Sequence, residues 1–119
     1  MKNDMSPEIL LKLLSDQTRL RCMLLLLQQG ELCVCELTYA LGLSQPKISR
    51  HLATLRDANV VNDRRAGQWI YYSVSTELPA WAADLLESIQ AGCSKQAQYQ
   101  RDLKILKKMP NRPANQVCA

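Results

Sequence analysis

The chain has 119 residues, of which 47% are apolar, so it is long enough for one domain with its own core. It shows neither a signal peptide nor an apolar run of membrane-spanning length, and we expect a cytoplasmic protein with no membrane partner. Five cysteines at irregular spacing argue against a disulfide framework, and the net charge of +4 is modest. We expect one domain over residues 1–109 and a flexible tail over residues 110–119.

Two helices are expected before the first cysteine pair. Ser6 precedes a proline and an acidic residue, which predicts a helix from Pro7 to about Leu14. Its apolar residues cover most of its circumference, so part of its surface is expected to face another subunit. Asp16 or Thr18 begins a second, central helix that ends at Gln29, and Cys22 within it is interpreted as a packing residue.

A pair of thiols marks the start of the third expected helix. Cys33 takes the N-cap position, Glu36 completes a capping-box pattern, and Cys35 follows near the second helical position. The helix dipole is expected to lower the pKa of both thiols and make them ligands for soft ions. Residues two apart on a helix diverge by about 200°, so one ion would bind both only if the first turn distorted. The alternative is that both cysteines are small half-buried hydrophobic residues.

The fourth expected helix begins at Ser44 and carries a polar, basic outer face. Ile48, Leu52 and Leu55 form its buried stripe, and the short preceding helix with Gly42 completes helix–turn–helix spacing. From Ser44 to Gln68 there are five basic and two acidic residues. His51 lies on the flank, where a hydrogen bond to backbone or DNA phosphate is expected rather than metal ligation. The candidate DNA-binding residues on this helix are Ser44, Gln45, Lys47, Ser49, Arg50 and His51.

A β-hairpin is expected to follow, with strands at Val60–Arg65 and Trp69–Val74 joined at Ala66 and Gly67. Arg64, Arg65 and Gln68 gather near its tip, where a wing would reach phosphates or a minor groove, although a solvated turn with ordinary surface arginines is the alternative.

Two further helices are expected, over residues 79–92 and 96–108. The first has a broad apolar stripe that suggests a dimer interface shared with the first helix of the chain. The chain is therefore expected to be mainly α with a small β-hairpin, in the order ααααββα(α). It contains no phosphate loop, no paired acids in an obvious cleft and no histidine near a nucleophile, so we do not expect an enzyme.

The runs ELCVCEL, SQPKISRHLATLR, DRRAGQWIYYSV and LPAWAADLL together resemble the arsenic-responsive branch of the ArsR/SmtB family of winged-helix metalloregulatory repressors. The likeness extends over roughly residues 7–90. It implies a winged helix-turn-helix homodimer that represses transcription by binding double-stranded operator DNA. It also implies release when arsenite or antimonite, as inducer, binds Cys33 and Cys35, with no organic cofactor.

One departure from the family pattern concerns the third sulfur. The arsenic branch often has another cysteine three residues after the second thiol, where this chain has Thr38. Cys93 and Cys118 are the remaining candidates for a third donor, although each is interpreted as a residue that does not bind the ion. The helix over residues 79–90 contains Asp84 and Glu87 but no histidine, which argues against a zinc site there.

The sequence is also compatible with other functions. One alternative is a repressor of the same fold that senses oxidants by joining the thiols, or that responds to cadmium or lead. A thiol redox enzyme is a weaker alternative.

Overall fold

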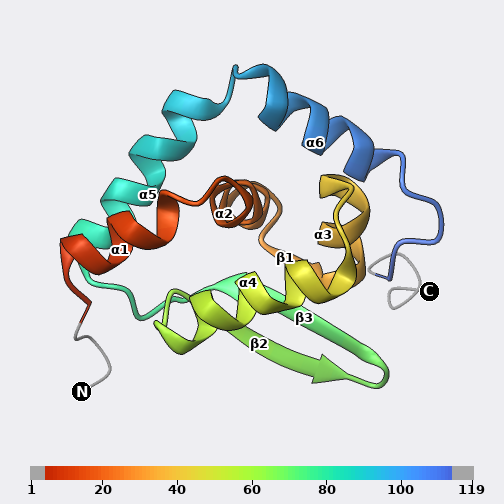
Figure 1. Cartoon of the computed structure of the whole chain (residues 1–119), viewed down its shortest axis with the longest axis horizontal. Helices are drawn as coiled ribbons and strands as arrows, with labels where there is room; N and C mark the ends of the chain where they lie inside the picture. The colour runs from red at the N-terminus through yellow and green to blue at the C-terminus, as the bar shows by residue number, and fades with distance from the viewer. Residues whose placement is uncertain (1–4, 114–119) are drawn as a thin grey trace.

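A computed structural model describes residues 5–113, which form six helices and a small antiparallel sheet at one edge of the molecule (Figure 1). The elements in chain order are α1 (Pro7–Leu14), α2 (Gln17–Gln29), β1 (Glu31–Cys33), α3 (Val34–Leu41), α4 (Gln45–Asp57), β2 (Val61–Ala66), β3 (Trp69–Val74), α5 (Ala80–Cys93) and α6 (Ala97–Lys107). The expected class, mainly α with a winged helix-turn-helix, is confirmed.

Three of the helices begin at the capping residues that the sequence predicts. Ser6 Oγ accepts a hydrogen bond from the Ile9 N–H at 3.2 Å, and Asp16 Oδ1 accepts one from the Arg19 N–H at 3.1 Å. Ser44 Oγ accepts one from the Lys47 N–H at 3.4 Å. Each cap satisfies a backbone donor that has no partner within its own helix, which fixes where the helix starts.

The sheet contains a strand that was not predicted from the sequence. β1 pairs antiparallel with β3, so the strand order is β1-β3-β2 and β3 lies in the middle. The register places Cys33 opposite Tyr71, and Tyr71 opposite Arg64 of β2. A three-residue strand has too little alternation to be recognised from its own residues, and it forms only because β3 supplies its partners.

The hairpin of β2 and β3, residues 61–74, is called the wing below. Its turn differs by one residue from the expected position, because Ala66 still pairs with Trp69 as part of the ladder. The two-residue loop is therefore Gly67 and Gln68. Gly67 has a φ of 62°, the left-handed region that glycine adopts without steric penalty.

The core is centred on α2, which packs against all the other helices and against the sheet (Figure 1). Met23 and Leu25 of α2 are fully buried, together with Leu10 of α1, Leu52 of α4 and Leu106 of α6. Cys22 is also fully buried, which confirms its packing role. Because α2 contacts every other helix, it joins the N-terminal and C-terminal parts of the chain in one core.

α3, a tight turn and α4 form the helix-turn-helix. Gly42, with a φ of 69°, ends α3 and redirects the chain. α4 and the wing lie on the same side of the molecule, opposite α6 (Figure 1). A face that carries both the second helix and the hairpin is the arrangement that a winged helix presents to DNA.

The chain beyond α6 turns back to α3. Arg112 forms an ion pair with Glu36 of α3, and Pro113 is buried. Arg112 and Pro113 therefore contact the domain, although both belong to the segment that was expected to form the flexible tail. Residues 114–119, with Cys118, lie outside the described residues.

Candidate metalloid site and DNA-binding face

The thiols of Cys33 and Cys35 lie together at the junction of β1 and α3. Their sulfur atoms are 3.1 Å apart. The expectation that they diverge is wrong, because Cys33 has the extended backbone of a strand, with φ of −74° and ψ of 151°, and the helical period begins only at Val34. Both sulfurs can therefore face one ion while the first turn of α3 stays intact.

The surroundings of the pair oppose ionisation of Cys35. Cys33 is buried and Cys35 is half-buried. Burial, the contact with Cys33 and the charge of Glu36 raise the pKa of Cys35 to about 12. The sequence-based expectation of a lowered pKa is wrong for Cys35, because burial and the neighbouring Cys33 and Glu36 outweigh the helix dipole.

Glu36 holds the end of β1, the start of α3 and the C-terminal segment together. Its Oε1 accepts a hydrogen bond from the Cys33 N–H at 2.8 Å, as the capping-box pattern predicts. Its Oε2 accepts one from Arg112 Nε at 2.6 Å. The Glu36 side chain is fully buried, so this pair is shielded from water. Sequence reasoning missed Arg112, because nothing near it in the chain points to a partner 76 residues away.

Two hydroxyl groups close to the thiol pair are buried without a hydrogen-bond partner among the described residues. They are Tyr71 Oη, on the strand beside Cys33, and Thr38 Oγ1, one turn after Cys35. Tyr71 also bears the Arg64 guanidinium over its ring, 4.7 Å from the centroid.

The remaining cysteines are not brought to the pair within the described residues. Burial raises the pKa of Cys22 to about 12, and the thiol lies inside the core. Cys93 is half-buried at the end of α5 and packs against that core. Residues 5–113 contain no cluster of three or more histidine, cysteine or acidic residues suited to a metal ion. Cys118 lies beyond them.

The candidate DNA-binding residues of α4 differ in exposure. Gln45 and Arg50 are exposed, and Lys47 and Ser49 are half-buried. Ser44 caps the helix. His51 Nδ1 accepts a hydrogen bond from Arg19 Nη1 at 3.2 Å, so its partner is a side chain of α2. Burial lowers the pKa of His51, outweighing the opposite influence of Asp16, and the neutral ring serves as acceptor.

In the wing, Arg64 and Arg65 have different surroundings. Arg64 donates two hydrogen bonds to the Glu31 carboxylate, each 2.8 Å long, across the Tyr71 ring. Arg65 follows on the same strand and is exposed, and so is Gln68 in the turn. Arg64 is thus held by Glu31 over the Tyr71 ring, whereas no described residue ion-pairs with Arg65.

A family model described as bacterial regulatory protein, arsR family, matches residues 16–63. An arsenic resistance transcriptional regulator of Pseudomonas putida is 48% identical over 116 residues, which cover 95% of this chain and 97% of the relative. The chain belongs to the arsR family. Members of this family are transcriptional regulators, so this is a DNA-binding protein and not an enzyme.

Solved structures of the same family share the fold. HlyU from Vibrio cholerae superposes with a TM-score of 0.66 and 33% identity, covering 74% of this chain and 91% of that chain. The AntR antimony-specific transcriptional repressor superposes with a TM-score of 0.63 and 28% identity, covering 76% of this chain and 79% of that chain. The winged helix is therefore supported by both sequence and structure.

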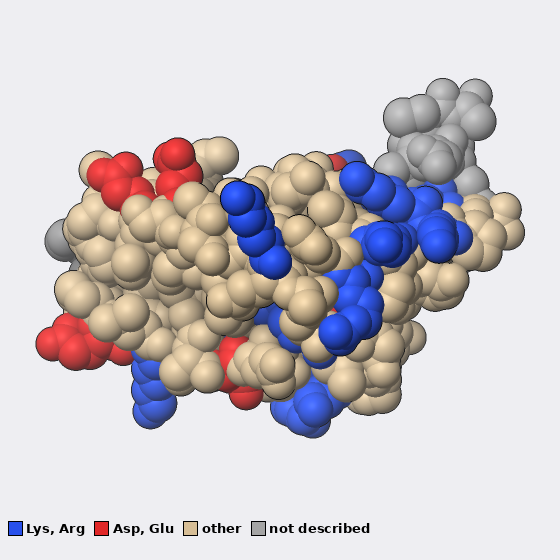
Figure 2. Space-filling view, turned by 90° about the horizontal axis from the view of Figure 1, so that it is seen from above, with Lys and Arg blue, Asp and Glu red and all other residues tan. Residues whose placement is uncertain are grey.

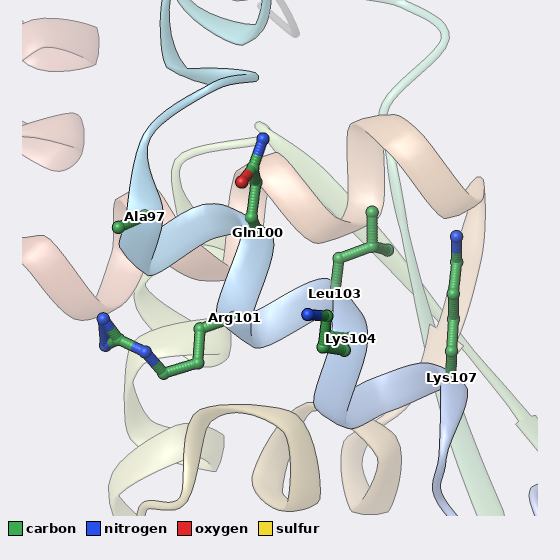
Figure 3. Close-up of a pocket in the computed structure, with 6 residues that line it drawn as sticks. All are labelled: Ala97, Gln100, Arg101, Leu103, Lys104 and Lys107. Carbon is green, nitrogen blue, oxygen red and sulfur yellow. The ribbon is translucent and has the colours of Figure 1, made fainter.

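A cavity of about 510 Å³ lies along α6 of this arsR-family protein, and neither thiol of the Cys33–Cys35 pair lines it (Figure 3). All of its lining residues come from α6, and Arg101, Lys104 and Lys107 give it a basic rim. Lysine and arginine gather over one end of the surface that includes α6, while acidic side chains lie at the other end (Figure 2). Because α4 and the wing are on the opposite side, this basic surface is separate from the DNA-binding face.

No helix within residues 5–113 is long and apolar enough to cross a membrane.

The different surroundings of the two wing arginines lead to a testable difference. We expect Arg65→Ala to weaken binding of operator and random DNA by similar factors, because an exposed arginine at a wing contacts phosphates. The salt slope should fall by about one unit for each phosphate that the variant no longer binds. Arg64→Ala should have the smaller effect, because Arg64 is already paired with Glu31. Salt-dependent fluorescence anisotropy measures both, and a larger reduction in affinity for Arg64→Ala would contradict this assignment.

Proposed function

We propose that this protein represses transcription by binding operator DNA and releases it when trivalent arsenic or antimony binds Cys33 and Cys35. The 3.1 Å contact between the two sulfurs carries the proposal. Trivalent arsenic is soft and pyramidal and prefers thiolate sulfur, so a pair of thiols already in contact is suited to it. The arsenic and antimony named for the similar regulators support the same inducer class.

The route from the thiols to DNA is short. α3 begins at the thiol pair, packs against α4 and is joined to it through Gly42. Cys33 also belongs to β1, which pairs with the wing strand β3. We infer that an ion bonded to both sulfurs changes how α3 packs between the sheet and α4, and so moves α4 relative to the wing. A tenfold loss of DNA affinity requires a coupling free energy of about 1.4 kcal/mol.

We also propose that the protein acts as a homodimer. Ile9 and Leu11 of α1 and Trp81 of α5 are large apolar residues that stay exposed, with exposed fractions of 46%, 54% and 38%. Such side chains on two helices suit an interface between identical subunits. A dimer presents two α4 helices to half-sites about 34–36 Å apart. Analytical ultracentrifugation tests this, and Leu11→Asp should shift the protein towards monomer.

The test of the inducer site uses cysteine variants. We expect Cys33→Ser and Cys35→Ser to bind DNA normally but no longer release it with arsenite, because each variant lacks one of the two sulfur donors. Fluorescence anisotropy on a fragment from upstream of the protein's own coding sequence measures release. A phosphine reductant keeps the thiols reduced without competing as a dithiol would.

Cys22→Ala is the matched control, since it removes a buried thiol that lies inside the core. It should release DNA with arsenite as the wild type does. Arsenite-driven release from the Cys33/Cys35 double variant would refute the site. Release that needs an oxidant and forms a disulfide, with no response to arsenite under reductant, would favour an oxidant sensor instead. Cys93→Ser and Cys118→Ser test whether either supplies a third sulfur.

A further inference from the structure

The hydroxyl groups of Tyr71 and Thr38 are buried without a hydrogen-bond partner among the described residues. A buried hydroxyl that makes no hydrogen bond destabilises the folded state, and native proteins contain few of them. Tyr71 is only 4% exposed, and the oxygen atoms of both Tyr71 and Thr38 are buried with no partner among residues 5–113. Both residues lie in the immediate surroundings of Cys33 and Cys35, so a ligand at the thiols would be their natural partner.

The sheet and α3 place both residues next to the thiol pair. Tyr71 is directly opposite Cys33 in the antiparallel ladder, so the two side chains are on the same face with their Cβ atoms roughly 5 Å apart. Thr38 is three residues after Cys35 on α3, which puts it on the same side of that helix. Burial and the charges of Cys33 and Glu36 raise the pKa of Tyr71, which keeps its phenol protonated and able to donate.

The chemistry of arsenite supplies a partner for such donors. Arsenous acid, As(OH)₃, condenses with two thiols to give (RS)₂As–OH and two molecules of water. Two As–O bonds break and two As–S bonds form, and each thiol proton leaves with a hydroxide as water. Arsenic stays trivalent, so no oxidant or reductant takes part. One hydroxyl remains on the arsenic, and in a buried site that oxygen needs hydrogen bonds.

We propose that Tyr71 and Thr38 bind the hydroxyl that arsenic retains, so that the bound inducer has two sulfur ligands and one oxygen ligand. The Tyr71 phenol donates to the retained oxygen, and the Thr38 hydroxyl, which can both donate and accept, completes its hydrogen bonds. This inference rests on the proposed function for the sulfur donors, Cys33 and Cys35. It adds two residues that select a hydroxo form of the metalloid over a form held by three sulfurs.

X-ray absorption at the arsenic edge, on full-length protein with phosphine reductant, tests the ligand set. We expect two sulfur ligands and one oxygen ligand in the wild type, and the same in Cys93→Ser and Cys118→Ser. Three sulfur ligands in the wild type would overturn the inference while leaving the proposed function intact. No arsenite binding, or binding unaffected by Cys33→Ser, would instead refute the proposed function.

Affinity measurements separate a ligand contact from a structural role. Tyr71→Phe and Thr38→Val each remove one hydroxyl and should weaken arsenite binding about five- to tenfold. Tyr72→Phe is the matched control, because Tyr72 is the next residue of β3, faces the other side of the sheet and should bind arsenite normally. Phenylarsine oxide binds the same two thiols with a phenyl group in place of the hydroxyl, so its affinity should not change in Tyr71→Phe. An equal reduction for both reagents, or unchanged arsenite affinity in either variant, would overturn the inference.

Discussion

Replacing Arg21 with methionine is expected to lower the free energy of unfolding by about 3–5 kcal/mol. Arg21 of α2 donates two hydrogen bonds to the carboxylate of Asp102 on α6, at 2.9 and 2.7 Å, and a further one to the Leu41 carbonyl at 3.2 Å. Asp102 is fully buried. The variant leaves its charge inside the protein with only Gln98 as a remaining side-chain partner among the described residues, which is a costly state.

The double variant Arg21→Met/Asp102→Leu is the control for this ion pair. It removes both charges and fills the space with apolar atoms, so it should recover most of the stability that the single variant lacks. Urea unfolding at one fixed protein concentration measures the variants, since the stability of the proposed dimer would depend on concentration. If Arg21→Met alone had the same free energy of unfolding as the wild type, the ion pair would not stabilise the packing of α6 on α2.

The helices could be predicted because their starting signals are local. Ser6, Asp16 and Ser44 each cap the backbone three residues further on, and the apolar stripe of α4 needs no distant partner. β1 could not be predicted in this way. Three residues become a strand only when β3, about forty residues later, lies beside them. The other helices, such as α5 and α6, have no side-chain cap and were expected from their apolar residues, whereas the junction where the thiols lie was misjudged.

That junction explains why the candidate site was only partly predicted. Cys33 and Cys35 were identified from their spacing, but the helical period was applied to Cys33, which belongs to a strand. The dipole argument for a low thiol pKa neglected burial and Glu36. Contacts such as Glu36 with Arg112, and Arg64 with Glu31, join residues far apart in the chain, and no local pattern encodes them.

The effect on DNA binding should be largest on α4. We expect Lys47→Ala and Arg50→Ala each to weaken operator binding about 10- to 100-fold, because a base contact by a long basic side chain contributes about 1–3 kcal/mol. Arg50 is exposed on the helix that the winged helix presents to the major groove. If a residue reads bases, random DNA should lose little affinity. If it contacts only phosphate, both DNAs should lose affinity equally and the salt slope should fall by about one unit.

Lys104→Ala provides the control for charge alone. Lys104 is exposed on α6, and this helix lies on the side of the molecule opposite α4 (Figure 1). Its removal changes the net charge as Lys47→Ala does, and it should leave operator affinity nearly unchanged. Fluorescence anisotropy at several salt concentrations compares the three variants. Equal reductions for Lys47→Ala, Arg50→Ala and Lys104→Ala would mean that overall charge drives binding, and the assignment of α4 as the reading helix would fail.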